Sequence, residues 1–173
     1  LVACTPENKQ EEDYSQYVNP MIGTDFTGNT YPGAQVPFGM VQLSPDNGLP
    51  GWDRISGDFY PDTTIAGFSH THLSGTGAGD LYDISFMPVT RPYKEAPAPL
   101  GIYSTFSHND EAASAGYYRV LLKDYNINVE LTATERCGIQ RYTFPEAEAS
   151  VFFHLKKAMN WDFTLDSKIE VVD

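Results

Sequence analysis

Apolar and polar residues alternate with a period of two along much of the second half of the chain, between residues 117 and 155. Residues on one face of a β-strand recur at every second position, so each alternating segment predicts a half-buried strand. The first two such strands include residues 118–122 and 127–133. Two further strands are expected over residues 138–144 and 150–155, and residues 145–148 separate them. Short strands with tight connections and no amphipathic helix predict an all-β fold, an antiparallel β-sandwich or barrel. The apolar positions of the first two segments are Tyr118, Val120 and Leu122, then Ile127, Val129, Leu131 and Ala133.

The first half of the chain has shorter apolar runs between long loops. Strands are expected over residues 38–44, 65–68 and 82–89. The stretches 23–33 and 48–62 are rich in Gly, Asp and other turn-forming residues, which favour loops over regular structure. No period of about 20–50 residues repeats, which excludes solenoids and propellers.

Composition supports one folded unit and excludes one class of partner. The 173 residues include 41% hydrophobic and 13% aromatic residues, enough for a packed core. The formal net charge of −12 argues against nucleic acid as a partner, because phosphates require a basic surface.

The N-terminus indicates a lipid anchor. Leu1-Val2-Ala3-Cys4 is typical of the end of a bacterial lipoprotein signal, in which Cys4 carries the lipid; a chance match of four residues is the alternative. We therefore expect residues 1–16 to be a signal remnant and tether, and residues 17–173 to be the folded domain. No apolar stretch of about 20 residues is present, so the lipid is the only expected membrane attachment. This predicts a cell-envelope lipoprotein, on the periplasmic side or at the outer-membrane surface.

Two other features concern a cysteine and the C-terminal end. Cys137 lies in a strand-like run, so we expect a buried structural thiol and no disulfide with Cys4. Residues 169–173 read as part of a strand, and a domain rarely ends on an unpaired apolar strand. We therefore expect a sandwich that is incomplete at its C-terminal end, the front portion of something larger.

The loop from Gly67 to Asp80 brings together two histidines, small hydroxylated residues and an acid. In an extended backbone, His70 and His72 would face the same way, as a metal pair requires. No nearby Cys or third His completes a zinc site, so hydrogen bonds within the loop, or to a polar ligand, are the stronger interpretation. The glycines fit neither dinucleotide-loop nor P-loop spacing, which argues against nucleotide binding.

Trp52-Asp53-Arg54 lies in a loop rich in Gly and Pro. An exposed indole packs on the apolar face of a sugar ring, while carboxylate and guanidinium groups bind its hydroxyls. The equally weighted alternative is that Trp52 caps the core and that Asp53 and Arg54 form a surface pair. Two of the loop carboxylates could provide the acid and base of a glycosidase, but linear spacing does not test their separation. These carboxylates belong to Asp25, Asp46, Asp58, Asp62 and Asp80.

Several ordered blocks of sequence resemble the N-terminal domain of glycoside hydrolase family 92. The longest are residues 17–24 (YVNPMIGT), 32–46 (PGAQVPFGMVQLSPD) and 67–77 (GFSHTHLSGTG). The resemblance continues through residues 106–108 (FSH), 116–118 (GYY), 129–134 (VELTAT) and 141–145 (RYTFP). So many blocks in one order make the resemblance specific, and it extends over nearly all of the chain after the tether.

The resemblance implies a bacterial, calcium-dependent exo-α-mannosidase, of α-1,2 type, that hydrolyses terminal mannose from glycans with inversion. It further implies an antiparallel, supersandwich-like N-terminal domain followed by a helical barrel domain. The family's general acid, general base and calcium ligands are expected mainly in that second domain, so we assign no catalytic or metal-binding residue here and expect this chain alone to be inactive.

The residues carried over are supporting ones. The resemblance implies that Trp52 lies against the sugar next to the scissile bond, with a mannose-containing glycan as the ligand. Weaker substrate-binding assignments go to Gly23, Thr24, Asp53, His70 and His72. Two other hypotheses are a carbohydrate-binding module of a glycan-uptake system and a purely structural sandwich that packs on a partner domain.

Overall fold

The structure, a computed structural model, describes residues 12–75, 81–97, 100–155 and 164–172. Over these residues it is all-β, with antiparallel sheets and three single-turn 3₁₀ helices: η1 (Tyr14–Tyr17), η2 (Trp52–Arg54) and η3 (His108–Asp110). The predicted antiparallel β-sandwich is confirmed. No helix among the described residues is both long and apolar enough to cross a membrane.

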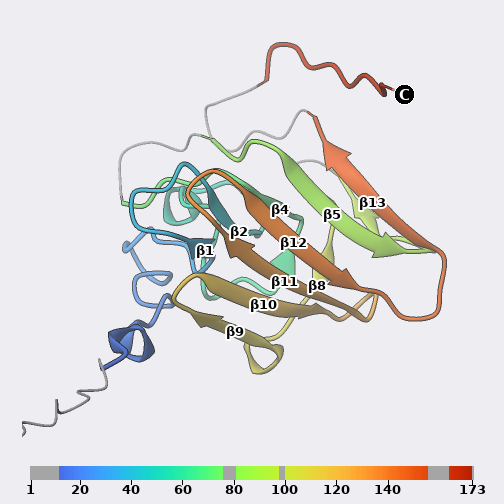
Figure 1. The fold of residues 1–173 in the computed structure, drawn as a ribbon. Coiled ribbons are helices and arrows are strands. Elements are labelled where there is room, and N and C mark those ends of the chain that lie inside the picture. The colour runs from blue at the N-terminus through green and yellow to red at the C-terminus, as the bar shows by residue number, and fades with distance from the viewer. Residues whose placement is uncertain (1–11, 76–80, 98–99, 156–163, 173) are drawn as a thin grey trace, which may run out of the picture.

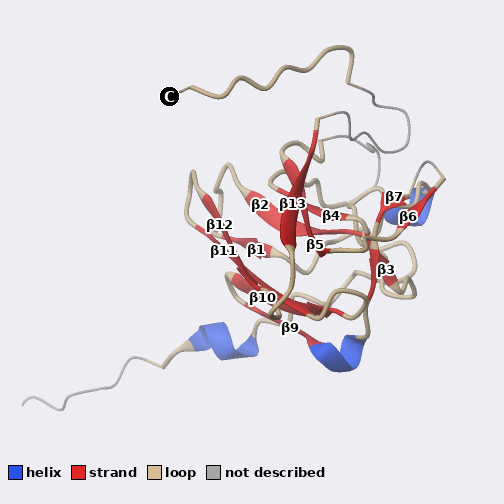
Figure 2. Cartoon of the chain, turned by 90° about the vertical axis from the view of Figure 1, so that its right-hand side faces the viewer, coloured by secondary structure: helices blue, strands red, loops and turns tan. Residues whose placement is uncertain are grey.

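Two sheets form the body of the fold, and Figure 2 shows them as stacked layers. The first sheet has the order β1-β2-β4-β5-β13, and the second has the order β12-β11-β10-β9. The strands of the first sheet are β1 (Ala34–Gln35), β2 (Gln42–Asp46), β4 (Gly67–Ser69), β5 (Ser85–Thr90) and β13 (Ala149–His154). Those of the second are β9 (Glu111–Ser114), β10 (Tyr117–Leu122), β11 (Ile127–Ala133) and β12 (Gly138–Thr143). Two small ribbons pair β3 (Thr64–Ile65) with β8 (Ser104–Thr105), and β6 (Glu95–Ala96) with β7 (Gly101–Ile102).

The core lies between the two sheets, and the alternating pattern explains its composition. Strand β11 buries Ile127, Val129 and Leu131 completely, while Asn128 and Thr132 on its other face are exposed. The opposite sheet contributes Leu43, Phe68, Met87 and Val89 to the same cluster. Burial of these side chains, at roughly 1.5–3 kcal/mol each, is the main force that holds the layers together.

Four local predictions need correction. The strand expected over residues 169–173 is wrong, because residues 169–172 are irregular; residue 173 lies outside the described residues. Strand β2 begins at Gln42 rather than residue 38, because residues 36–39 form a turn closed by a bond from the Gly39 amide to the Val36 carbonyl. The apolar run 65–68 is divided between β3 and β4, which belong to different sheets. Cys137 is exposed, not buried, because the chain turns between β11 and β12 there; Cys4 lies outside the described residues.

Candidate functional site

Trp52 lies in η2, within the loop that joins β2 to β3; we call residues 48–62 the Trp52 loop. Its side chain is 53% exposed, so it is not part of the buried core. Asp53, its neighbour, is half-buried. An indole that keeps half of its surface open on a loop is available to pack against a ligand.

Arg54 holds the Trp52 loop closed. Its guanidinium donates to both oxygens of Asp62, at 2.6 Å from Nε and 2.5 Å from Nη2, and it also lies over the Phe59 ring at 4.6 Å. Hydrogen bonding to Asp62 raises the pKa of Arg54. The alternative of a surface pair between Asp53 and Arg54 is therefore wrong, because the guanidinium group of Arg54 pairs with the mostly buried carboxylate of Asp62.

Buried polar contacts anchor the rest of the Trp52 loop to the sheet. The Asn47 amide group donates to the Thr64 carbonyl at 3.0 Å, and its oxygen accepts from the Phe59 amide at 2.5 Å. The Tyr82 hydroxyl donates to the Ile55 carbonyl, close to η2. Two of these bonds satisfy backbone groups of the loop, the Phe59 amide and the Ile55 carbonyl, and the third holds Asn47 against β3. Together they fix the backbone that carries Trp52.

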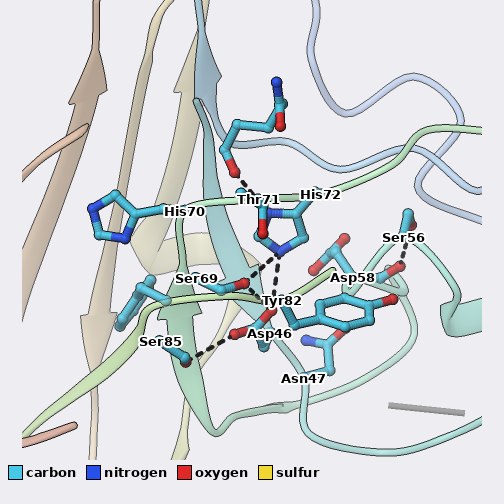
Figure 3. A network of polar contacts seen from close by, with 12 residues as sticks. Asp46, Asn47, Ser56, Asp58, Ser69, His70, Thr71, His72, Tyr82 and Ser85 are labelled. Carbon is cyan, nitrogen blue, oxygen red and sulfur yellow. Dashed lines mark hydrogen bonds and ion pairs between the residues drawn. The ribbon is translucent and has the colours of Figure 1, made fainter. Parts of the chain in front are cut away.

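His72 is buried and packs against this loop at Gly57; Figure 3 shows it together with Asp46, Ser69 and Tyr82. Its Nδ1 lies 2.7 Å from the Gln42 carbonyl, which only accepts, so Nδ1 carries a proton. Its Nε2 lies 2.9 Å from Oδ1 of Asp46. Two hydroxyls donate to the same carboxylate, Ser69 at 2.8 Å and Ser85 at 3.2 Å. A Cβ at Gly57 would lie 2.8 Å from the His72 ring, so only glycine allows the loop to approach this closely.

His70 points the other way (Figure 3). The backbone bends at His70, which follows β4, and this bend overturns the expectation that the two histidines share a direction. Nδ1 of His70 lies 2.8 Å from the Ile84 carbonyl, and the ring lines a cavity of about 330 Å³ with Phe86, Tyr142 and Phe153. The described residues include no group of three or more His, Cys, Asp or Glu side chains arranged to hold a metal ion.

The other substrate-binding candidates support the neighbouring loop. Thr24 is buried; its hydroxyl donates to the Met21 carbonyl at 3.1 Å, and its carbonyl accepts from the Tyr60 amide at 2.9 Å. Gly23 has φ +89° and accepts a bond from the Thr30 amide at 3.2 Å. Thr24 and His72 are therefore turned into the protein, whereas Trp52 and Asp53 lie at its surface.

Most of the candidate carboxylates are occupied inside the fold. Asp46 and Asp62 are paired as described above, and Asp25 accepts from the Phe26 amide at 2.7 Å. Asp58 is buried, and burial, followed by the nearby charge of Glu111, raises its pKa well above the ordinary value. Asp80 lies outside the described residues.

Sequence reasoning missed the residues that hold the site. Asn47 and Tyr82 carry the anchoring bonds, yet neither stands in a motif that marks it. The signal for Asp46 was its place at the end of a strand, directly before the turn-rich loop. Its partner His72 is 26 residues away in the sequence, so no local pattern joins the two.

Comparison with known proteins places this architecture in a family. One structure is similar with 47% identity and a TM-score of 0.73: a family GH92 α-mannosidase from Bacteroides thetaiotaomicron, solved in complex with mannoimidazole. The match covers 79% of this chain and 19% of that one. A family GH92 inverting mannosidase from Bacteroides thetaiotaomicron VPI-5482 is 30% identical with a TM-score of 0.66, over 82% of this chain and 20% of that one.

A third relative is described as an uncharacterized secreted glycosidase from Arthroderma benhamiae. It is 28% identical over an alignment of 149 residues, and the match covers 80% of this chain and 18% of the relative. The chain thus spans about a fifth of the length of the proteins it matches. The family model of the glycosyl hydrolase family 92 N-terminal domain matches residues 17–173, and the chain belongs to that family.

Proposed function

We propose that this chain is the N-terminal domain of an inverting exo-α-mannosidase and that it contributes one wall of the substrate pocket. The 47% identity to an α-mannosidase solved with mannoimidazole carries the proposal. The similarity to an inverting mannosidase supports the stereochemical part. Because the chain covers about a fifth of these relatives, the activity is proposed for the whole protein.

Trp52 is the residue proposed to contact the sugar. The exposure of its indole, and the buried bonds that fix its loop, support this role. A rigid aromatic face orients a pyranose without losing much side-chain entropy on binding, because the indole has few rotatable bonds. Asp53 is proposed to accept a bond from a sugar hydroxyl beside it.

The chemical step requires groups from the rest of the protein. Inversion needs a carboxylic acid on the leaving oxygen, and a carboxylate that activates water on the opposite face of the ring. In the described part of this chain, Asp46, Asp58 and Asp62 are buried. We therefore place the acid and base in a second domain, with the helical barrel suggested by the family resemblance as the candidate. A calcium ion, also proposed for the whole enzyme, would bind sugar hydroxyls and favour a distorted ring; its ligands would lie in the second domain as well.

The deciding experiment uses the full-length protein. Purified enzyme should release mannose from α-1,2-linked mannobiose, and nuclear magnetic resonance should show β-mannose as the first product. The α-1,3- and α-1,6-linked isomers, tested in parallel, establish linkage preference, and a calcium chelator tests metal dependence. The 173-residue chain alone should show no turnover, because without a second domain nothing encloses the substrate.

Two results would contradict the proposal. Release of mannose by the 173-residue chain would place the catalytic groups here. Binding of mannan by a full-length protein without turnover on any linkage would favour a carbohydrate-binding module instead.

The location proposed for the protein is the cell envelope. The description of one relative as secreted supports export, and the lipoprotein-like residues 1–4 support a lipid on Cys4. Labelling of cells with a clickable fatty acid should tag the wild-type protein, whereas Cys4→Ser should abolish the tag. A tag that persists in Cys4→Ser would contradict the assignment.

A further inference from the structure

The turn at residues 36–39 places a phenylalanine where turn chemistry favours glycine. The Gly39 amide donates to the Val36 carbonyl at 3.0 Å, Pro37 takes the second position, and Phe38 takes the third with φ +62°. This combination matches a type II turn, whose third residue needs a positive φ and is usually Gly or Asn. For a bulky side chain that conformation is unfavourable, because the Cβ atom comes too close to the following carbonyl oxygen.

The strained turn holds the Phe38 ring in solvent. The side chain is fully exposed, and Met40, two residues on, is 71% exposed. The turn is fixed in place, because the Met40 amide donates to the Glu135 carbonyl at 2.7 Å, in the connection between β11 and β12. Exposure of an aromatic ring to water is unfavourable, and here the backbone conformation adds a further cost. We therefore expect another protein surface or a ligand to cover the ring.

More apolar surface adjoins this turn. Figure 1 shows the β9–β10 and β11–β12 connections at one end of the second sheet, beside the segment that precedes β1. A hollow of about 470 Å³ at this end is lined by Val18, Ile22, Pro37 and Gly116, among others. Val18 and Ile22 are themselves more than half exposed. We call Val18, Ile22, Phe38 and Met40 the apolar end face.

We infer that the apolar end face is the surface on which a later domain of the same polypeptide docks, with Phe38 as its central anchor. The inference rests on the proposed function, in which a second domain completes the enzyme. The length of the relatives supports this occupant, because about four fifths of each lies outside the matched region, and the matched family model is that of an N-terminal domain. Aromatic side chains that become buried when two surfaces associate often lie at the centre of a stable interface.

The test measures how fast a cysteine at position 38 reacts with a maleimide in the native full-length protein. Phe38→Cys is compared with Lys123→Cys, an exposed site at the opposite end of β10, and site-specific labelling is read by peptide mass spectrometry. Phe38→Cys should label at least about tenfold more slowly than Lys123→Cys, as for a site that reacts only when an interface opens. In urea the two rates should converge.

A second site guards against a local effect of the Phe38 substitution. Met40→Cys should be protected in the same way. Adding Phe38→Asn, which keeps a residue suited to a positive φ but removes the ring, should speed labelling of Met40→Cys. Adding Phe38→Tyr instead should leave it slow.

Three results would overturn the inference. Labelling of Phe38→Cys and Met40→Cys at the Lys123→Cys rate would leave the face uncovered. Protection that develops only as protein concentration rises would make a second copy the occupant, and protection that requires added α-mannoside would make it a glycan surface. None of these readouts depends on turnover, so a full-length protein without mannosidase activity would contradict the proposed function while the labelling still tests the docking surface.

Discussion

His72 and Asp46 lie in contact inside the sandwich, with Nε2 2.9 Å from Oδ1 and no exposed surface on either side chain. The contact joins the segment after β4 to the last residue of β2, beside the Trp52 loop. Two serine hydroxyls, those of Ser69 and Ser85, donate hydrogen bonds to the same carboxylate. The loop is thus supported by a buried cluster of polar groups that are hydrogen-bonded to one another.

Removing one member of this pair should be strongly destabilising. His72→Ala leaves the Asp46 carboxylate buried without its partner, and such a loss typically costs about 3–5 kcal/mol. The free energy of unfolding, measured by urea titration, should show it. His70→Ala is the matched control, because that ring is half-buried and its removal leaves no buried charge; its effect should be clearly smaller. Equal losses at the two positions would contradict the role of the pair.

The raised pKa of Asp58 predicts that its contribution to stability falls as pH rises. Its pKa is raised in the folded protein, first by burial and then by nearby carboxylates. An aspartate whose pKa is raised on folding makes its full contribution to stability below its ordinary, unfolded-state pKa of 3.8. This contribution is lost as pH rises through the higher pKa of the folded state.

Asp58→Asn removes this titration and should therefore stabilise the protein at neutral and alkaline pH, with the two proteins converging in acid. Urea unfolding across that pH range measures the difference. A variant that is less stable than wild type at neutral pH would contradict the prediction.

Two bidentate arginine–carboxylate pairs allow a matched comparison. Arg54 bonds the mostly buried Asp62, whereas Arg141 bonds Glu130 at the surface, with its own side chain 71% exposed. Arg54→Lys loses the fork and the contact with Phe59, and should cost about 1–3 kcal/mol of stability. Arg141→Lys should cost at most about 1 kcal/mol, since water screens an exposed pair. Chemical denaturation of the two variants gives both values, and equal costs would mean that burial does not strengthen the Arg54 pair.

Trp52→Ala in the full-length enzyme should reduce catalysis more than stability. Stacking of an aromatic face is worth roughly 0.5–1.5 kcal/mol beyond area burial, which corresponds to a loss of about 2- to 13-fold in kcat/KM. The melting temperature should change little, because the indole is half exposed. Trp52→Phe keeps an aromatic face and should retain most of the activity. Early melting with normal kinetics would instead indicate a packing role, for which truncation costs about 3–5 kcal/mol.

The second sheet is the part of the fold that the sequence determines most directly. The alternation through residues 117–143 predicted β10, β11 and β12, which the structure contains as consecutive antiparallel neighbours. Both the period of two and the hairpin connections are local properties, so a short stretch of sequence is enough to specify them. The loops rich in Gly and Asp were predictable for the same reason. Trp52 lies in one of them and is exposed, which is one of the two alternatives that the sequence left open.

Only the tertiary structure decided which segments distant in the sequence contact one another. Strand β13 follows β12 in the chain but pairs with β5 in the other sheet, a contact that joins Phe153 to Phe86. The bend at His70 sends two neighbouring histidines in opposite directions, and the pairing of His72 with Asp46 spans 26 residues. Long-range pairing depends on which buried surfaces meet when the two sheets pack, and residue spacing along the chain does not contain that information.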